Sequence, residues 1–555
     1  MLKQKKLIFY FVVLFLILLS SASTAQIVYE PVNRDIYNFL LRISQRGVIE
    51  FNSQIKPVSR MYIAQKLNAL SQKSINLTSL ERKELEFYKE EFGIELSILK
   101  KKPESEAALN SDYSFGKDKY GRFRLFSFSN DLFKINLDPI LGYEVGKTNS
   151  KNRNHIWNGV SLFGYLSDNI GFSFDFRDNS ESGAGIDSAK IFTPVTGVNP
   201  KLGKAYEYNE MNVSLSYNWS WGEISVGKGF FRWGYGKDGN IVLSTKAPSF
   251  PYFRLDIYPV NWFRFNYIHG WLNSKVIDSS LSYKSLRSSP DFDRSIYRIK
   301  YFASHTIILT PLKGLDFSLG ESIIYSDRLE YAYLIPIMFF RLADHYLSNM
   351  NNNTGDNAQF FFGISSKNHI KNTHLYGSLF IDEIRTSEIF NSAQQKNQFG
   401  FTIGGSITDL PINNFTANIE FTKIYPFVYR HFIPTQTYEN QGYLMGHWIG
   451  DNADLIYASL NYRFIRGLNL KLWYEYIRKG AEGTAEQMYT VPQPPFLFGL
   501  RTNYTHIGLD VKYEIIHDLF ARAKFQYTKI EKEQENLSFN TESFSEFSFA
   551  VFYGL

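Results

Sequence analysis

From about residue 110 to its end, the chain alternates between apolar and polar side chains with a period of two. In the segment 211–221, every odd position is apolar or aromatic and every even position is Asn or Ser. The pattern recurs at 415–422 and in two paired runs, 456–476 and 507–527, each interrupted by a short polar turn. Such alternation is typical of β-strands with one apolar and one polar face, and the paired runs predict antiparallel hairpins.

The lengths of these runs indicate what covers the apolar face. Several reach nine to eleven residues, which exceeds most strands of soluble sandwiches and matches a tilted strand that crosses a bilayer. Because a backbone in lipid must satisfy every hydrogen bond internally, a sheet in the membrane has to close on itself. We therefore expect residues 106–555 to form a mainly β fold, a transmembrane outer-membrane β-barrel of about 18 antiparallel strands, within a range of roughly 16 to 20.

The polar face is then expected to line the lumen. Its charged members include Asp175, Arg177, Glu420, Lys471, Glu475, Lys512, Glu514, Arg522 and Lys524. Tryptophans near strand ends are expected to form interfacial girdles. These are Trp219, Trp221, Trp262, Trp271 and Trp473. Segments rich in Gly, Ser, Asn, Pro and charge are candidate extracellular loops, at 180–206, 274–294, 347–358 and 480–496. The segment 331–347 has helical as well as strand character and is a candidate element of the lumen.

Residues 31–105 show the periodicity of helices instead. Apolar residues at helical spacing predict one helix around 36–43, a second one that begins after Ser59, and a third one after Thr78. Thr78 and Glu81 fit a capping box at the start of the third helix. We expect a small periplasmic helical domain over residues 26–105, which is too small to be stable without a partner surface.

The first 25 residues have the three parts of a secretory signal peptide. A basic start with three lysines precedes the apolar run 7–19, and small residues at 23–25 predict Sec export with cleavage near Ala25. The apolar run of 13 residues is shorter than a membrane-spanning helix requires. Loss of the three lysines would lower the formal net charge from +6 to +3, which is too small and diffuse to indicate a nucleic-acid partner.

The sequence offers little support for catalysis. It contains no Cys, which excludes thiolate metal sites, disulfides and a Cys nucleophile, and its ten His form no metal-binding pair. A G-x-G-x-x-G string at 234–239 is followed by the strand-like residues 241–243 and not by a helix, so we interpret it as a turn and not as a nucleotide site. We expect no catalytic residue, cofactor or metal, and an embedded hydrolase has no motif behind it.

Two neighbouring segments carry a family resemblance. Residues 227–239 read GKGFFRWGYGKDG and residues 243–251 read LSTKAPSFP. Here the chain resembles the Wzi-type capsule-assembly family, whose barrel has an Arg-x-Trp-Gly-like glycine-rich turn followed by a Leu-Ser-x-x-Ala-Pro-x-Phe segment. In this chain Arg and Trp are adjacent, without the intervening residue. Further stretches are also similar, at 56–60, 319–322, 334–340, 355–357, 382–383 and 444–450.

This resemblance implies a non-enzymatic outer-membrane protein that attaches capsular or other extracellular polysaccharide to the cell surface as a lectin would. Its partners would be the polysaccharide and outer-membrane lipid, and we expect a monomer. Aromatic rings, amides and charges can contact sugar faces and hydroxyls. The candidate polysaccharide-binding residues are Arg232, Trp233, Tyr235, Lys237, Asp238, Glu321, Asp356, Asn357 and His447.

Each of these residues also has a structural interpretation. A Tyr or Trp near a strand end is commonly an interfacial anchor, and a charge facing inward commonly belongs to a lumen network. The polar inward positions also leave open a different function, that of a general or substrate-specific outer-membrane porin.

Overall fold

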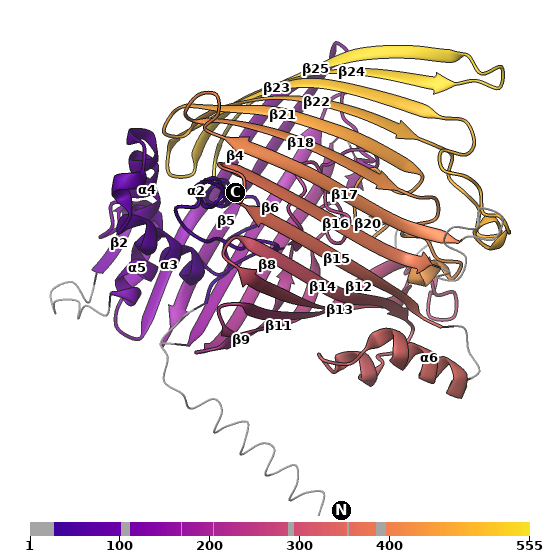
Figure 1. Ribbon diagram of the computed structural model, residues 1–555, viewed down its shortest axis with the longest axis horizontal. Helices are drawn as coiled ribbons and strands as arrows, with labels where there is room; N and C mark the ends of the chain where they lie inside the picture. The colour runs from indigo at the N-terminus through magenta and orange to yellow at the C-terminus, as the bar shows by residue number, and fades with distance from the viewer. Residues whose placement is uncertain are drawn as a thin grey trace, which may run out of the picture.

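The computed structural model describes residues 27–100, 111–167, 169–203, 205–286, 293–351, 355–384 and 396–554, so the expected signal peptide lies outside the described residues. Within them, 18 antiparallel strands close into one barrel (Figure 1). In order round the barrel these are β4 (Phe133–Thr148), β5 (Lys151–Leu166), β6 (Ile170–Ser182), β8 (Tyr206–Trp219), β9 (Gly222–Gly229), β11 (Phe250–Val260), β12 (Phe263–Ile277), β13 (Tyr297–Leu312), β14 (Leu315–Ser326), β15 (Asn357–Lys367), β16 (Thr373–Ile384), β17 (Asn397–Thr408), β18 (Phe415–Ile424), β21 (Ala453–Ile465), β22 (Leu468–Lys479), β23 (Thr502–Ile516), β24 (Leu519–Glu533) and β25 (Phe539–Tyr553).

Closure joins the last strand to the first one of the ring. β25 pairs with residues 141–148 of β4, and the hairpin of β2 (Ser111–Lys117) and β3 (Phe123–Ser129) continues the wall along residues 134–137. The short strand β7 (Lys201–Leu202) adds to β8. The strand number deduced from the length and periodicity of the sequence is therefore confirmed.

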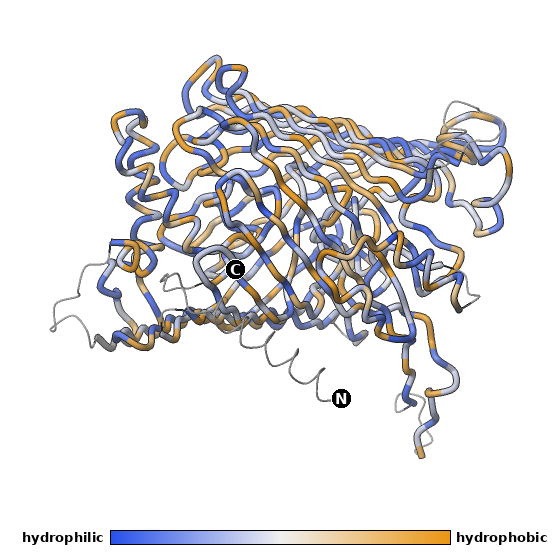
Figure 2. The backbone as a smooth tube through the Cα atoms, turned by 60° about the horizontal axis from the view of Figure 1, so that its bottom comes forward, coloured by the Kyte–Doolittle hydropathy of each residue, from blue (hydrophilic) through white to orange (hydrophobic). Residues whose placement is uncertain are grey.

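The alternation in the sequence separates the outer surface of the barrel from its lumen. Met211, Val213 and Leu215 on β8 point outward and are 39–53% exposed, whereas Ser214 and Ser216 point inward and are at most 6% exposed. Figure 2 shows the same alternation of hydrophobic and hydrophilic residues along the strands. An apolar outer band of this extent is the surface that a transmembrane barrel presents to lipid.

One of the expected girdle residues faces the other way. Trp262 and Trp271 lie on the outer surface, 57% and 41% exposed. Trp473 is 7% exposed and lies in the lumen, where its ring covers Gly508 of the neighbouring strand. The prediction for Trp473 was wrong because this residue lies on the same face of β22 as Glu475, and that face points into the lumen. The position of a residue in the strand, and not its aromatic character, determines which face it occupies.

The two ends of the barrel differ. At one end, here called the turn end, adjacent strands are joined by short connections such as Arg466-Gly467 and His517-Asp518. At the other end, the loop end, the described connections include the long segments 278–296, 327–356, 425–452 and 480–501. Three of these overlap candidate loops of the sequence, and the connection between β6 and β8 lies within the remaining candidate, 180–206. The segment 425–452 is an additional long loop.

The three helices expected near the amino terminus are present. They are α2 (Ile36–Gln45), α3 (Arg60–Ser71) and α4 (Ser79–Glu91), and η1 (Ser74–Asn76) and α5 (Gly93–Leu99) complete the helical segment. Ser59 caps α3, and Thr78 and Glu81 form the expected capping box at the start of α4. The helices share an apolar core and lie at the turn end of the barrel (Figure 1). No described helix is long and apolar enough to cross a bilayer.

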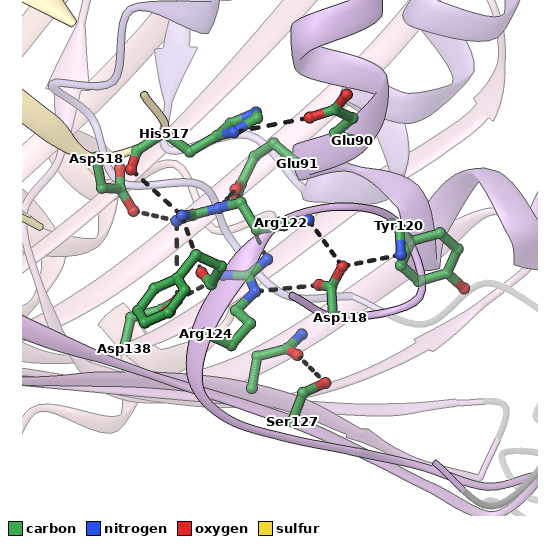
Figure 3. Close-up of polar contacts among 12 residues, drawn as sticks. Glu90, Glu91, Asp118, Tyr120, Arg122, Arg124, Ser127, Asp138, His517 and Asp518 are labelled. Carbon is green, nitrogen blue, oxygen red and sulfur yellow. Dashed lines mark hydrogen bonds and ion pairs between the residues drawn. The ribbon is translucent and has the colours of Figure 1, made fainter. Parts of the chain in front are cut away.

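Buried ion pairs hold the helical segment to the turn end (Figure 3). Asp518, in the turn between β23 and β24, accepts hydrogen bonds from the guanidinium groups of Arg34 and Arg122. Arg122 also donates to Glu91 of α4 over 2.5 Å. Burial opposes the ionisation of Asp518, but the charges of Arg34 and Arg122 outweigh it and lower its pKa to about 2. On another side of the barrel, Arg42 of α2 binds Asp409 in the β17–β18 turn.

Candidate functional site

The glycine-rich turn that follows β9 enters the lumen. Its short strand β10 (Arg232–Trp233) pairs antiparallel with β1 (Ile55–Lys56) of the helical segment, so that Lys56 lies opposite Arg232. The amide of Trp233 donates to the carbonyl of Leu243 over 2.8 Å, and its ring packs against inward-facing Phe361 of β15. The turn thus connects the helical segment with the barrel wall.

Two glycines make this turn possible. Gly234 has a φ of +111°, a conformation that disfavours other residues, and its amide donates to the carbonyl of Gln54 over 2.7 Å. A Cβ on Gly236 would lie 1.8 Å from the carbonyl oxygen of Gly239. No helix follows the G-x-G-x-x-G string, which agrees with its interpretation as a turn.

The loop-end segment 425–452 folds inward onto this turn. The indole nitrogen of Trp448 donates to the carbonyl of Asp238 over 2.6 Å. The hydroxyls of Tyr429 and Tyr438 donate to the carbonyls of Ile241 and Val242 over 2.6 and 2.8 Å. Within this segment β19 (Glu439–Asn440) pairs with β20 (Tyr443–Leu444). We call the apolar unit formed by residues 230–250 and 425–452 the central plug, because it joins the inward faces of the surrounding strands in one buried cluster.

A polar cavity of about 470 Å³ lies between the central plug, the helical segment and the wall formed by β18 and β21 to β24. It extends from Arg232 and Lys237 of the glycine-rich turn to Arg466 and Gly467 at the turn end. Beside it, Glu420 of β18 accepts hydrogen bonds from the amide of Lys237 over 2.9 Å and from the hydroxyl of Tyr376 over 2.7 Å. Its volume is in the range of small-molecule binding sites.

The structure brings six of the nine candidate binding residues together. Arg232, Trp233, Tyr235, Lys237 and Asp238 share the glycine-rich turn, and His447 covers Gly239. Among them only Arg232 and Lys237 line the cavity as cations. Trp233 is 3% exposed, so its ring offers no free face to a sugar. Tyr235 accepts a hydrogen bond from the ammonium of Lys367 over 3.0 Å.

His447 is buried without a charged neighbour. Burial lowers its pKa to about 3, so the imidazole is neutral at physiological pH. Its Nε2 atom has no hydrogen-bond partner, and its Nδ1 atom accepts from the amide of Ile449 over 3.4 Å. We therefore assign His447 a packing role against the glycine-rich turn.

Asp356 and Asn357 lie apart from this group, before and at the start of β15. Asp356 accepts hydrogen bonds from Tyr333 over 3.0 Å and from Gln436 over 2.8 Å, and Asn357 donates to the carbonyl of Gln436 over 2.9 Å. Both residues thus connect the loop between β14 and β15 with the segment 425–452.

Glu321 lies on the outer surface of β14. It accepts hydrogen bonds from the amides of Phe340 over 2.9 Å and Arg341 over 2.5 Å at the start of α6 (Phe340–Asn351). The segment with η4 (Tyr331–Leu334) and α6 packs outside the barrel over β12 to β15, and not in the lumen as its sequence had suggested (Figure 1). There it covers polar outward residues such as His305, whose ring centroid lies 4.6 Å from that of Phe340.

Replacing Glu321 by Ala is expected to loosen α6 from the wall. The change removes the acceptor for two amides at the helix start, and losing such a cap costs about 1 kcal/mol. Hydrogen exchange of residues 341–351 should accelerate several-fold. Glu207→Gln, at an exposed position of β8, should leave this exchange unchanged, and equal exchange in the Glu321 variant would contradict the capping role.

The sequence placed the cavity residues Lys471, Lys512, Glu514 and Arg522 in the lumen, but it did not connect them with the glycine-rich turn. Lys56 opens a stretch that resembles the family, yet nothing in its neighbourhood shows that it meets Arg232, which is far away in the chain. Among the asparagines of the cavity, Asn418, Asn461 and Asn469 occupy inward positions in the alternating strands, and the alternation of the sequence was the available signal for them.

Comparisons with known proteins give the chain a family. The family model of the capsule assembly protein Wzi matches residues 171–542. The structure of Wzi, an outer-membrane protein of Escherichia coli described as a carbohydrate-binding β-barrel involved in group 1 capsule assembly, aligns with a TM-score of 0.56 at 13% identity, covering 96% of this chain and 100% of that one.

Weaker structural similarity extends to other barrels. Acinetobacter baumannii OccAB2 aligns with a TM-score of 0.42 at 12% identity, covering 76% of this chain and 97% of that one. Pseudomonas aeruginosa OccK10 (OpdN) aligns with a TM-score of 0.40 at 10% identity, covering 75% and 98%. Among curated protein sequences, none matches the chain significantly. Since the Wzi model matches well over half of the residues, the chain belongs to the family of the capsule assembly protein Wzi.

Proposed function

We propose that this protein is a non-enzymatic outer-membrane barrel that holds capsular or other extracellular polysaccharide at the cell surface in the manner of a lectin. The Sec signal of residues 1–25 would export it, the turn end with the helical domain of residues 26–105 would face the periplasm, and the loop end the exterior. The central plug is the observation that carries the proposal, because a lumen packed with apolar side chains is suited to binding and not to passage.

The remaining polar surface supports polysaccharide as the ligand. Arg232 and Lys237 are available to acidic groups in the cavity, and Asp356 and Asn357 lie near the loop end. The carbohydrate binding of the Escherichia coli protein is consistent with this role, although at 13% identity it is a likeness of fold.

Deleting the gene should release capsule into the medium while total polysaccharide synthesis continues. The measurement is the ratio of cell-bound to released polysaccharide, with the deletion complemented by the intact gene as the control. Capsule that stays on the surface of the deletion strain would refute the proposal.

A substrate-specific channel is the second candidate, and the polar inward positions favour it. Single-channel recording in planar bilayers separates the two functions, because a plugged barrel carries little current and an open one gives a steady conductance step. We expect no steady step from the intact protein.

A further inference from the structure

The cavity beside the glycine-rich turn holds more positive charge than its carboxylates balance. Several of its cations have carboxylate partners. Arg463 binds Glu84 over 2.9 Å, and Lys512 binds Asp35 over 2.8 Å. Arg522 binds Asp510 over 2.6 Å.

Three other cations meet at the glycine-rich turn and at the strand that pairs with it. Among the described residues, no carboxylate oxygen lies within 4.0 Å of the side-chain nitrogens of Lys56, Arg232 or Lys237. The guanidinium of Arg232 donates to the carbonyl of Gly236, and the ammonium of Lys56 lies 4.7 Å from the ring centroid of Tyr37. All three residues line the same cavity.

The backbone forces two of these charges together. Lys56 on β1 and Arg232 on β10 are cross-strand partners in an antiparallel pair, and like charges in such positions repel each other. The nearby carboxylate, Glu420, is engaged by the amide of Lys237 and the hydroxyl of Tyr376. A short two-stranded sheet that places two cations face to face beside a third is therefore suited to an anion between them.

The pKa values of the lysines reflect the crowding of positive charge. Burial lowers the pKa of Lys56 well below its usual range, and the charges of Arg232 and Lys237 lower it further. Burial and the charge of Arg232 lower the pKa of Lys237 to about 8. An anion in the cavity would reverse both shifts, since an opposite charge favours the protonated amine.

The rest of the lining indicates what carries the anion. Six asparagines supply amide donors and acceptors, as sugar hydroxyls require. They are Asn33, Asn38, Asn414, Asn418, Asn461 and Asn469. The half-buried Tyr88 adds aromatic surface on which the apolar face of a sugar ring can rest. A site for inorganic phosphate would not need this amide and aromatic lining.

We propose that Lys56, Arg232 and Lys237 form a subsite for a carboxylate-bearing sugar of an acidic polysaccharide, in the cavity between the central plug and the helical segment. The inference rests on the proposed function and specifies its ligand as a uronic-acid-type residue. It also places the subsite on the turn-end side of the central plug, away from the exposed loops where a surface lectin would be expected to bind.

Calorimetric titration of the full-length protein in detergent tests this subsite. The probes are a galacturonic acid trimer, the neutral sugar maltotriose and inorganic phosphate. The acidic trimer should bind at least about tenfold more tightly than either of the others, because it alone combines carboxylates for charge-assisted hydrogen bonds with the hydroxyls of a sugar. No binding of the trimer, or equal binding of maltotriose or phosphate, would overturn the proposal.

Variants connect the binding to these residues. Lys56→Gln and Lys237→Gln should each weaken binding of the trimer about tenfold. Lys313→Gln, at an exposed position in the β13–β14 turn, is the matched control and should bind like the unmodified protein. Without ligand, Lys56→Gln should raise the unfolding temperature, because it relieves repulsion from Arg232, whereas loss of an ordinary structural contact would lower it. Unchanged binding in both variants would exclude the subsite.

The binding experiment and the capsule-release assay can refute the two proposals independently. If the deletion strain keeps its capsule while the purified protein binds the trimer with the expected variant pattern, the proposed function is wrong and the acidic-sugar subsite stands. If capsule is released but the trimer does not bind, the subsite is wrong and the proposed function stands.

Discussion

Replacing Asp518 by Asn should weaken the docking of the helical segment on the barrel by about 3–5 kcal/mol, which is the cost of breaking a buried ion pair from one side. Asp518 neutralises both Arg34 and Arg122, and the side chain of Arg122 is 1% exposed. An amide leaves the buried guanidinium of Arg122 and the half-buried one of Arg34 without this charge. We expect proteases to cleave residues 27–100 much faster in the variant.

The control for this prediction is a solvent-exposed ion pair on the same protein. Glu542 pairs with Lys532 over 2.7 Å, and both side chains are more than half exposed. Glu542→Gln should therefore change stability by less than about 1 kcal/mol. If the two variants are cleaved at the same rate, Asp518 does not hold the segment in place.

Acid should produce the same undocking. The pKa of Asp518 is lowered from about 4 to about 2 in the folded protein, so its stabilisation is complete above about pH 4 and is lost as the pH falls through 2. The proteolysis rate of a detergent-solubilised sample, pre-incubated at each pH, should rise in that window. Undocking already between pH 7 and 5 would show that other groups control the contact.

Periodicity in the sequence predicted the barrel because a strand that separates lipid from a polar lumen has to alternate. In each run such as 211–221, the alternation shows which side chains face lipid and which face the lumen. A sheet in lipid has to close, and the length of the alternating region then gives the approximate number of strands. The helices could also be predicted from the sequence, since capping by Ser59 and by Thr78 with Glu81 depends on residues three positions apart. These features are local, which is why the sequence alone contains them.

The features that the sequence could not predict depend on distant contacts. Trp473 is an aromatic residue of the kind found in interfacial girdles, but its position in the alternation of β22 directs it into the lumen. Glu321 occupies an outward position among apolar residues, which is tolerable only because α6 returns to cover it. The subsite requires Lys56 to pair with Arg232 across a two-stranded sheet, a register that neither segment specifies by itself.

The central plug itself leads to the other large expected effect. Trp448 is 3% exposed, and its ring packs edge-on against Phe192 with centroids 5.3 Å apart. Its indole nitrogen makes a 2.6 Å hydrogen bond to the carbonyl of Asp238, which links the segment 425–452 to the glycine-rich turn. Trp448→Ala removes both the ring and this link, and truncation of a buried Trp costs about 3–5 kcal/mol.

In planar bilayers, Trp448→Ala should therefore produce brief conductance steps that the intact protein lacks, because water enters where the ring was and the two halves of the plug can separate. Trp262→Ala is the control for the loss of an indole, since Trp262 lies on the outer surface and its removal leaves the lumen unchanged. If the intact protein already shows steady steps of the size seen in the Trp448 variant, the plug does not close the barrel and the channel function gains support. If the variant stays closed despite its lower stability, the other plug contacts, such as those of Tyr429 and Tyr438, are sufficient to seal the lumen.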